Sequence, residues 1–268
     1  MRRFSIILCL LLLMQQSIAQ KLMQLPDSLS QLGEPLQVKQ KTGIGFLRYE
    51  FGPYRLLNSR KGWTTKSTAT TERHDVLSRL LSNVEEVEQN IKEKRSFKLL
   101  RNDTDTAIVN IAVSSTLYYN RPKNNIFGRN EGPATYNRGK SNLVTTILSA
   151  DTSDWIFSTA QQETAGVVSI SEEIIGVLTN GIREIELLPV NHYADGKKAM
   201  FALGYVFIEN GKPIAAVQFR GLPLMAHKQN FVWLPKNESK EMQFVIAAVA
   251  TAILGMSHEM IASGGTGL

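Results

Sequence analysis

The sequence predicts a mainly β protein of the α+β class, an antiparallel β-barrel of about twelve strands that encloses a C-terminal hydrophobic helix. Two observations support this fold class. A long series of short apolar runs is divided by turn signals, of which Asn180-Gly181 and Asn210-Gly211 are the clearest, and Asn-Gly favours the two-residue turn of a β-hairpin. After this series, residues 244–256 are apolar on every side of a helix. Because such a helix must be surrounded, a sheet that closes around it accommodates both observations.

The expected strands are the apolar and β-branched runs between these turn signals. They are residues 44–51, 54–58, 96–100, 107–113, 143–149, 155–158, 167–170, 174–178, 182–190, 199–208, 213–219 and 231–234. The runs 96–100 and 107–113 flank the polar turn 101–105, and this arrangement predicts a hairpin.

Residues 74–94 differ from the rest of this series. Their apolar side chains recur at three- and four-residue spacing, which is typical of an amphipathic helix, and Glu88 and Lys92 form an i, i+4 pair that supports a helix. We therefore expect a helix here. The second half is rich in Val, and a strand is the alternative for that half. The apolar positions are Val76, Leu77, Leu80, Leu81, Val84, Val87 and Ile91.

The C-terminal helix has its own start signals. Asn237 or Ser239 can cap it, and Glu238 and Glu241 lie in its first turn, where carboxylates favour the positive end of the helix dipole. An apolar stretch of this length rises about 20 Å, whereas the hydrocarbon core of a bilayer is about 30 Å thick. We therefore expect burial within protein and no transmembrane span in the mature chain. Contact of residues 244–256 with a membrane is the alternative.

Residues 1–19 have the features of a secretory signal peptide. Arg2 and Arg3 precede an apolar run at 4–14, and small residues Ser17 and Ala19 suit signal peptidase. The sequence therefore predicts an exported protein, periplasmic or extracellular and of bacterial type. After residue 19 we expect an N-terminal lead at 20–41 that is loosely held, a single barrel-like domain at 42–262 and a flexible tail at 263–268.

Composition excludes several kinds of site. Cys9 is the only cysteine and lies in the predicted signal peptide, so the mature chain has no disulfide, thiolate metal site or cysteine nucleophile. The net charge of +6 comes from scattered lysines and arginines, which argues against nucleic-acid binding. No two of the four histidines stand at metal-ligand spacing. We predict no metal, no cofactor and no catalytic residue.

The order of elements resembles that of the tubby-like β-barrel superfamily, which includes the LURP-one-related proteins and the phospholipid scramblases. The likeness rests on the hairpin at 97–113, the run 204–212 and the helix at 244–256, and it covers about residues 44–262. It implies a roughly twelve-stranded barrel around a C-terminal helix. Members of this superfamily bind phosphoinositides or membranes, but no residue cluster of this chain matches their binding motifs, so the resemblance supplies no binding residue.

One segment is a candidate binding site. Residues 117–142 are expected to form a long loop in which basic and aromatic side chains alternate, a composition that suits stacking and charge-assisted hydrogen bonds. Its ligand would be an anionic lipid, a glycan or an envelope protein. The alternative is a solvated, mobile loop. The candidate residues are Tyr118, Tyr119, Arg121, Lys123, Phe127, Arg129, Tyr136, Arg138 and Lys140.

The sequence therefore favours a non-enzymatic binding or envelope-associated domain. A secreted hydrolase is the alternative, because its site could assemble from residues that are distant in sequence. Glu172-Glu173 and the pair Glu184 and Glu186 are the carboxylates such an enzyme could use. A Ser and His also adjoin at 257–258, although the flanking glycines of a serine-hydrolase elbow are incomplete there.

Overall fold

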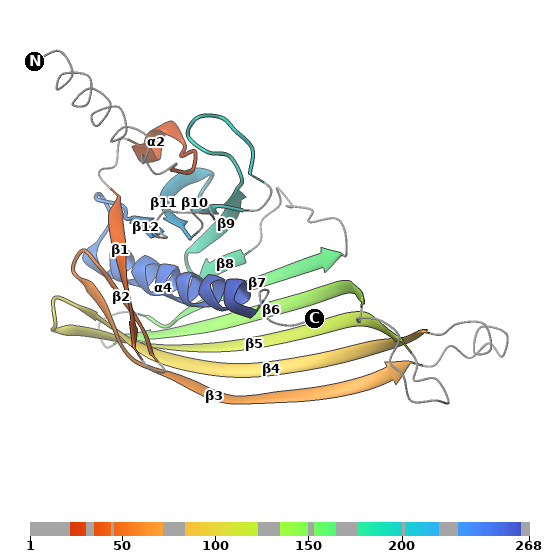
Figure 1. The fold of residues 1–268 in the computed structure, drawn as a ribbon. Coiled ribbons are helices and arrows are strands. Elements are labelled where there is room, and N and C mark those ends of the chain that lie inside the picture. The colour runs from red at the N-terminus through yellow and green to blue at the C-terminus, as the bar shows by residue number, and fades with distance from the viewer. Residues whose placement is uncertain are drawn as a thin grey trace, which may run out of the picture.

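The protein is a closed barrel of twelve antiparallel strands (Figure 1). The computed structural model describes residues 22–30, 35–43, 46–71, 84–122, 135–149, 153–164, 176–199, 202–219 and 230–263. Each strand lies beside its neighbours in sequence, and β1 pairs with β12 to close the ring. The predicted antiparallel, mainly β barrel is confirmed.

The twelve strands differ greatly in length. β3, β4 and β5 have 18 residues each, whereas β8 and β12 have 4 each. The strands are β1 (Leu36–Gly43), β2 (Phe46–Phe51), β3 (Tyr54–Thr71), β4 (Val84–Arg101), β5 (Asp105–Pro122), β6 (Thr135–Ser149), β7 (Trp155–Thr164), β8 (Gly176–Thr179), β9 (Glu184–Val190), β10 (Gly204–Glu209), β11 (Lys212–Gln218) and β12 (Asn230–Trp233).

Because of this difference, β3–β7 continue beyond the closed part of the barrel, and Figure 1 shows them running past the end of the C-terminal helix. The main cluster of buried apolar side chains ends at Leu56 on β3, Phe97 on β4 and Ile111 on β5. We call the remainder of these five strands the projecting sheet. It consists of residues 58–71, 84–96, 112–122, 135–142 and 159–164.

The C-terminal helix α4 (Lys240–Ser263) packs against β5, β6 and β12. Every side chain from Phe244 to Leu254 is buried, with at most 7% exposed, and all the apolar ones belong to one cluster with inward side chains of the strands. The Ser239 hydroxyl accepts a hydrogen bond from the Met242 N–H at 3.2 Å, so Ser239 is the cap. Among the helices of the described part, none has a stretch long and apolar enough to cross a bilayer.

Both Asn-Gly dipeptides lie in hairpin turns, but only Asn210-Gly211 forms the predicted two-residue turn, because β8 and β9 are joined by the longer loop of residues 180–183. Asn210 and Gly211 join β10 to β11 with φ of 49° and 72°, the left-handed backbone that a type I′ turn needs. Gly181 lies between β8 and β9 with φ of 84°. Of the other expected strands, 167–170 lies outside the described residues.

The helix expected at 74–94 is wrong for residues 84–94, which belong to β4. The strand alternative for the second half is correct. β4 pairs with β5 along its whole length, from Val84 opposite Pro122 to Arg101 opposite Asp105. This continuous ladder of backbone hydrogen bonds outweighs a helical spacing of apolar residues that is weak in Val-rich sequence. Residues 72–83 lie outside the described part.

The N-terminal lead is also not loosely held. Met23 and Leu29 are buried, with 1% and 0% exposed, and Leu29 lies in the short helix α2 (Asp27–Ser30). They pack with Val206, Ala216 and Trp233 in a second cluster, on the outer face of β10–β12 because Val206 alternates with the inward-facing Tyr205 and Phe207. β1 then begins at Leu36, ahead of the expected domain start at 42. The predicted signal peptide and residues 264–268 lie outside the described residues.

Candidate binding surface

The residues 117–142 that were expected to form a loop are largely strand. β5 continues to Pro122 and β6 begins at Thr135, so Tyr118, Tyr119 and Arg121 lie on β5 while Tyr136, Arg138 and Lys140 lie on β6. The prediction of a long loop is wrong for these positions, because the β-branched and aromatic residues at 113–119 favour a strand and pair with both β4 and β6. Lys123, Phe127 and Arg129 lie outside the described residues.

The candidate residues do not share one surface. Tyr118 and Tyr119 are successive residues of a strand, so their side chains point to opposite faces of the sheet. Tyr118 lies opposite Glu88, and Lys140 lies opposite Thr116, which places Tyr118 and Lys140 on the outer face. Tyr119 lies opposite Val87 on the inner face. The structure therefore brings Tyr118 and Lys140 together and separates Tyr119 from them.

An ion-pair cluster lies on the inner face of the projecting sheet, where β3 meets β4. The Lys61 ammonium is 3.1 Å from a Glu93 carboxylate oxygen, and Arg95 pairs with the same carboxylate. The Thr64 hydroxyl donates to Glu93 at 3.4 Å. Burial raises the pKa of Glu93, but hydrogen bonds from Arg95 and Lys61 outweigh this effect and hold the pKa below its ordinary value. The cluster fixes β3 against β4 with the glutamate ionised.

The side of β3 that points away from β4 forms an open sheet edge. On the side away from β4, the described residues pair with β3 only at Tyr54 and Arg55, so residues 56–71 have no described strand beside them there. We call the backbone of residues 56–71 on this side the β3 edge. Every residue from Arg60 to Thr70 is exposed. Such an edge presents N–H and C=O groups that another strand can pair with.

Two bulges shape the first part of the β3 edge. The register with β4 shifts between Leu57 and Arg60 and again between Lys61 and Thr64, each time with two residues of β3 opposite one of β4. Gly62 lies in the second bulge, where a Cβ would come within 3.0 Å of the Lys94 carbonyl oxygen. Its neighbour Trp63 is 94% exposed, which is unusual for so large an apolar side chain. From Thr64 to Thr71 the register is continuous.

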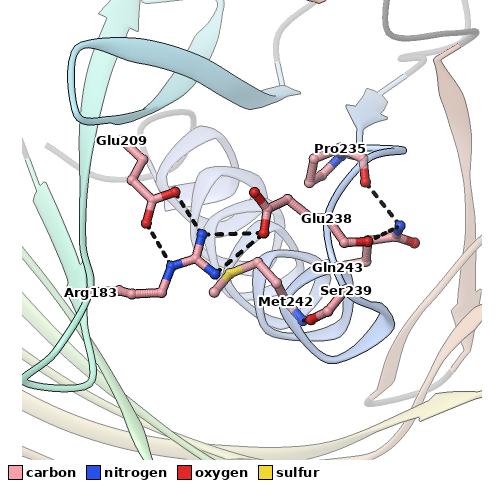
Figure 2. Close-up of polar contacts among 7 residues, drawn as sticks. All are labelled: Arg183, Glu209, Pro235, Glu238, Ser239, Met242 and Gln243. Atoms are coloured by element: carbon pink, nitrogen blue, oxygen red, sulfur yellow. Dashed lines mark hydrogen bonds and ion pairs between the residues drawn. The ribbon is translucent and has the colours of Figure 1, made fainter.

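The opposite end of the molecule holds a second charged cluster, shown in Figure 2. Arg183 donates two hydrogen bonds of 2.6 Å to the two carboxylate oxygens of Glu209, and it also donates to Glu238 at 3.2 and 3.3 Å. The Asn180 side chain accepts the N–H of Arg183 at 2.8 Å, which fixes the turn that presents the arginine. These contacts join the β8–β9 turn, the end of β10 and the segment before α4. The cluster is a structural clamp on the start of the helix.

This clamp and the β3 edge were not predicted from the sequence. A Glu lies 26 residues after Arg183 and another lies 55 residues after it, and no local pattern connects them. The open edge exists because, in the described part of the chain, β2 pairs with β3 only at Tyr54 and Arg55. The length of this pairing cannot be predicted from the sequence. Trp63, between Gly62 and a run of threonines, is the one local signal that could have indicated an exposed aromatic residue in a sheet.

Neither a metal centre nor a hydrolase site emerges in the part of the chain that is described. No group of three His, Cys, Asp or Glu side chains there could hold a metal ion. Glu184 and Glu186 lie on the outer face of β9, opposite Thr179 and Val177. Glu172-Glu173 lies outside the described residues, and the side chains of Ser257 and His258 are not described.

The chain matches no family model, and no curated protein or solved structure is significantly similar to it.

Proposed function

We propose that the protein is a non-enzymatic binding domain of a bacterial envelope. In this proposal the barrel, with α4 enclosed in it, is a rigid scaffold, and the projecting sheet is the surface that binds the ligand. The single observation that carries the proposal is the length of β3–β7, which continue as a polar five-stranded sheet after the apolar core has ended.

The burial of α4 supports its role as the filling of the barrel. Side chains on every side of the helix from Phe244 to Leu254 are buried, and the Tyr49 hydroxyl on β2 donates to the Leu254 carbonyl at 3.2 Å. The Arg101 guanidinium lies 5.3 Å from the centre of the Phe244 ring, and it donates to the Lys240 carbonyl at 2.5 Å. A helix that is held at Lys240 and at Leu254 and is buried between Phe244 and Leu254 gives the strands a fixed curvature.

The chemistry of the buried side chains favours binding over catalysis. Where side chains are described, the buried polar ones are Thr145, Asn191, Gln218, Asn230 and Thr251. None of these is an acid, a base or a thiol, whereas enzyme sites gather titratable groups in sheltered positions. Among the residues that the structure describes, no comparable observation favours the hydrolase alternative.

The projecting sheet has the properties of a ligand surface. Its side chains are exposed or half-buried, Val87 being the exception among those described. Its outer face carries exposed cations on three strands, namely Arg60 on β3, Lys92 and Lys94 on β4, and Lys140 on β6, whereas Lys66 on β3 lies on the inner face. An anionic lipid headgroup, an acidic glycan or an acidic protein segment fits this surface. Export to the envelope and the resemblance to the tubby-like superfamily stay predictions.

Binding assays on the full chain test this proposal. The probes are phosphatidylglycerol vesicles, an array of acidic glycans and a displayed library of random peptides. We expect at least one class to bind, and we expect the affinity to fall about tenfold in the double variant Lys92→Glu, Lys94→Glu, which reverses two charges on the outer face. Lys212→Glu, an exposed lysine at the start of β11, is the matched control and should bind like the wild type.

Three results would overturn the proposal. The first is that none of the three probe classes binds. The second is a ligand whose affinity is the same in the wild type, the double variant and the control. The third is turnover of an ester, glycoside or phosphate that a single substitution abolishes.

A further inference from the structure

We propose that the β3 edge binds an extended, acidic polypeptide segment as an additional antiparallel or parallel strand. This inference rests on the proposed function and names the ligand class of the projecting sheet. Its starting point is the open side of β3, where the described residues leave the backbone of residues 56–71 without a neighbouring strand.

The backbone of the β3 edge is suited to strand addition. In a ladder, alternate residues direct their N–H and C=O groups to each side of a strand, so β3 presents on its open side the groups that do not bond to β4. Over Thr64–Thr71 the register with β4 has no shift, and the exposed residues there are small or polar. The side chains therefore do not obstruct an incoming backbone, and an added strand gains a hydrogen bond at every second residue.

The bulges and charged side chains that normally protect a sheet edge are unevenly distributed along β3. Proteins discourage unwanted pairing with bulges, lysines and charged residues along an edge. On β3 both bulges lie between Leu57 and Thr64, and the last cation is Lys66. The section from Ser67 to Thr71 has neither. The second half of the β3 edge is therefore open to pairing with another strand.

Charge selects an acidic partner. Residues 56–71 contain Arg60, Lys61 and Lys66 and no acidic residue. Lys61 pairs with Glu93, whereas Arg60 and Lys66 are exposed on opposite faces of the sheet, opposite Ser96 and Ile91. A second copy of the chain, paired antiparallel about Trp63, would place Arg60 opposite Lys66, and like charges across strands are destabilising. Carboxylates at those positions are stabilising instead.

The acidic residues of the ligand should lie toward the start of the edge. β4 brings Glu88 opposite Ala69 and Glu86 opposite Thr71, so the far end of the edge has carboxylates next to it. Near Arg60 and Lys66 the net charge of the side chains is positive. This polarity fixes the register of the added strand, because a shifted ligand would place its carboxylates beside Glu86 and Glu88.

Trp63 supplies an anchor for the ligand. It lies in the second bulge with 94% of its surface exposed, and it stands between Lys61 and Lys66 in the sequence. Exposed tryptophans contribute strongly when an interface covers them. A ligand strand on the β3 edge would pass directly beside this side chain.

Selection from a displayed library of random peptides of about ten residues, with the full chain as target, tests the inference. We expect the enriched peptides to be acidic and rich in β-branched residues. Their affinity should fall about tenfold on Trp63→Ala and on Lys66→Glu. The matched controls are Ile182→Ala, which removes an apolar side chain that is 91% exposed in the β8–β9 turn, and Lys212→Glu. Both controls should bind like the wild type.

Two further measurements locate the bound peptide. Methylation of alternate backbone nitrogens of an enriched peptide should abolish binding, because it removes the ladder hydrogen bonds. Hydrogen exchange of the complex should slow at the amides of residues 64–71. Trp63 and Lys66 are exposed, so their variants should melt like the wild type.

Failure of this inference can be told apart from failure of the proposed function. The strand-addition inference is overturned if no peptide is enriched, if the enriched peptides are neutral or basic, or if the exchange protection falls outside β3. If vesicles or acidic glycans still bind in a manner that depends on Lys92 and Lys94, the binding function stands without it. If no probe class binds, both are overturned.

Discussion

The Arg183 side chain holds the segment before α4 to the end of β10, through hydrogen bonds to Glu238 and Glu209. Its side chain is 34% exposed, and the side chains of its partners Glu209 and Glu238 are 13% and 28% exposed. Hydrogen bonds from the guanidinium to these carboxylates hold the pKa of Arg183 well above its ordinary value. The planar guanidinium of Arg183 donates to both carboxylate oxygens of Glu209 at once. The single ammonium group of a lysine cannot reproduce this geometry. The contact is therefore specific to arginine.

We predict that Arg183→Lys and Arg183→Met lower the free energy of unfolding by about 1 to 3 kcal/mol, with the larger loss for Met because Glu209 and Glu238 then repel each other. Urea unfolding followed by circular dichroism measures this. The control is Arg55→Met, which breaks an ion pair with Asp103 whose side chains are 44% and 68% exposed and should lose less than about 1 kcal/mol. Equal losses at the two sites would contradict the clamp.

The lowered pKa of Glu93 predicts that the stability of the fold depends on pH. Because its pKa is lower in the folded protein than the ordinary value of 4.5, ionised Glu93 stabilises the fold above that pH. The contribution is lost as the pH falls through the folded pKa. Thermal melts should therefore show that Glu93→Gln is less stable than the wild type near neutral pH and that the difference shrinks below about pH 4.5.

Glu184→Gln, which removes an exposed carboxylate of β9, is the control for this titration and should leave the wild-type profile unchanged. A Glu93→Gln variant whose deficit is the same at every pH would show that the loss is one of packing and would contradict the charge argument.

At the scale of elements, the N-terminal segment, β10 and β11 meet at Gly204. A Cβ at this position would lie 2.1 Å from the Val217 carbonyl oxygen and 2.6 Å from the Met23 sulfur. Met23 is held there because its N–H donates to the Gln218 side chain at 3.1 Å. The close approach of three segments is therefore possible only with glycine.

Gly204→Ala should lower the free energy of unfolding by more than about 2 kcal/mol, since backbone must move to relieve the overlap. Gly255→Ala in α4 is the matched control. Nothing lies within 4 Å of a Cβ there, and alanine favours a helix by up to about 1 kcal/mol. Chemical denaturation of both variants measures the contrast, and a Gly204→Ala variant as stable as the wild type would contradict the packing described here.

The elements that the sequence predicted well are those with local signals. The Asn-Gly turns need a left-handed backbone at 181, 210 and 211, and Ser239 caps α4 through a bond to a residue three positions away. Both are decided within a few residues. The apolar runs of β6, β7, β11 and β12 are likewise readable because one or both faces are buried.

The elements that were missed are decided by distant partners. Residues 84–94 have helical spacing, yet β5 pairs with them from a position beyond the turn at 102–104. Met23 and Leu29 look like parts of a polar lead until β10 and β11 cover them. The candidate binding residues failed for the same reason, because Tyr118 and Tyr119 were placed in a loop that could gather them, whereas paired strands send them to opposite faces.

At the scale of the whole molecule, the protein consists of two parts that are stabilised in different ways. The closed part is apolar inside, and its twelve strands and α4 form one cluster of buried side chains. The projecting sheet is polar and exposed, and its stability rests on backbone pairing and on contacts such as the Glu93 cluster. This division suits recognition. The closed barrel holds the projecting sheet in place, so little conformational entropy is lost when a ligand binds to the sheet.

Native-state hydrogen exchange of the full chain in increasing denaturant tests this division most directly. We predict that the amides of residues 244–254 exchange only through global unfolding, with the free energy and denaturant dependence of the whole barrel, whereas those of residues 64–71 exchange through small local openings. Exchange of the α4 amides by local opening, at free energies well below the global value, would contradict an enclosed helix and with it the scaffold on which the proposed function depends.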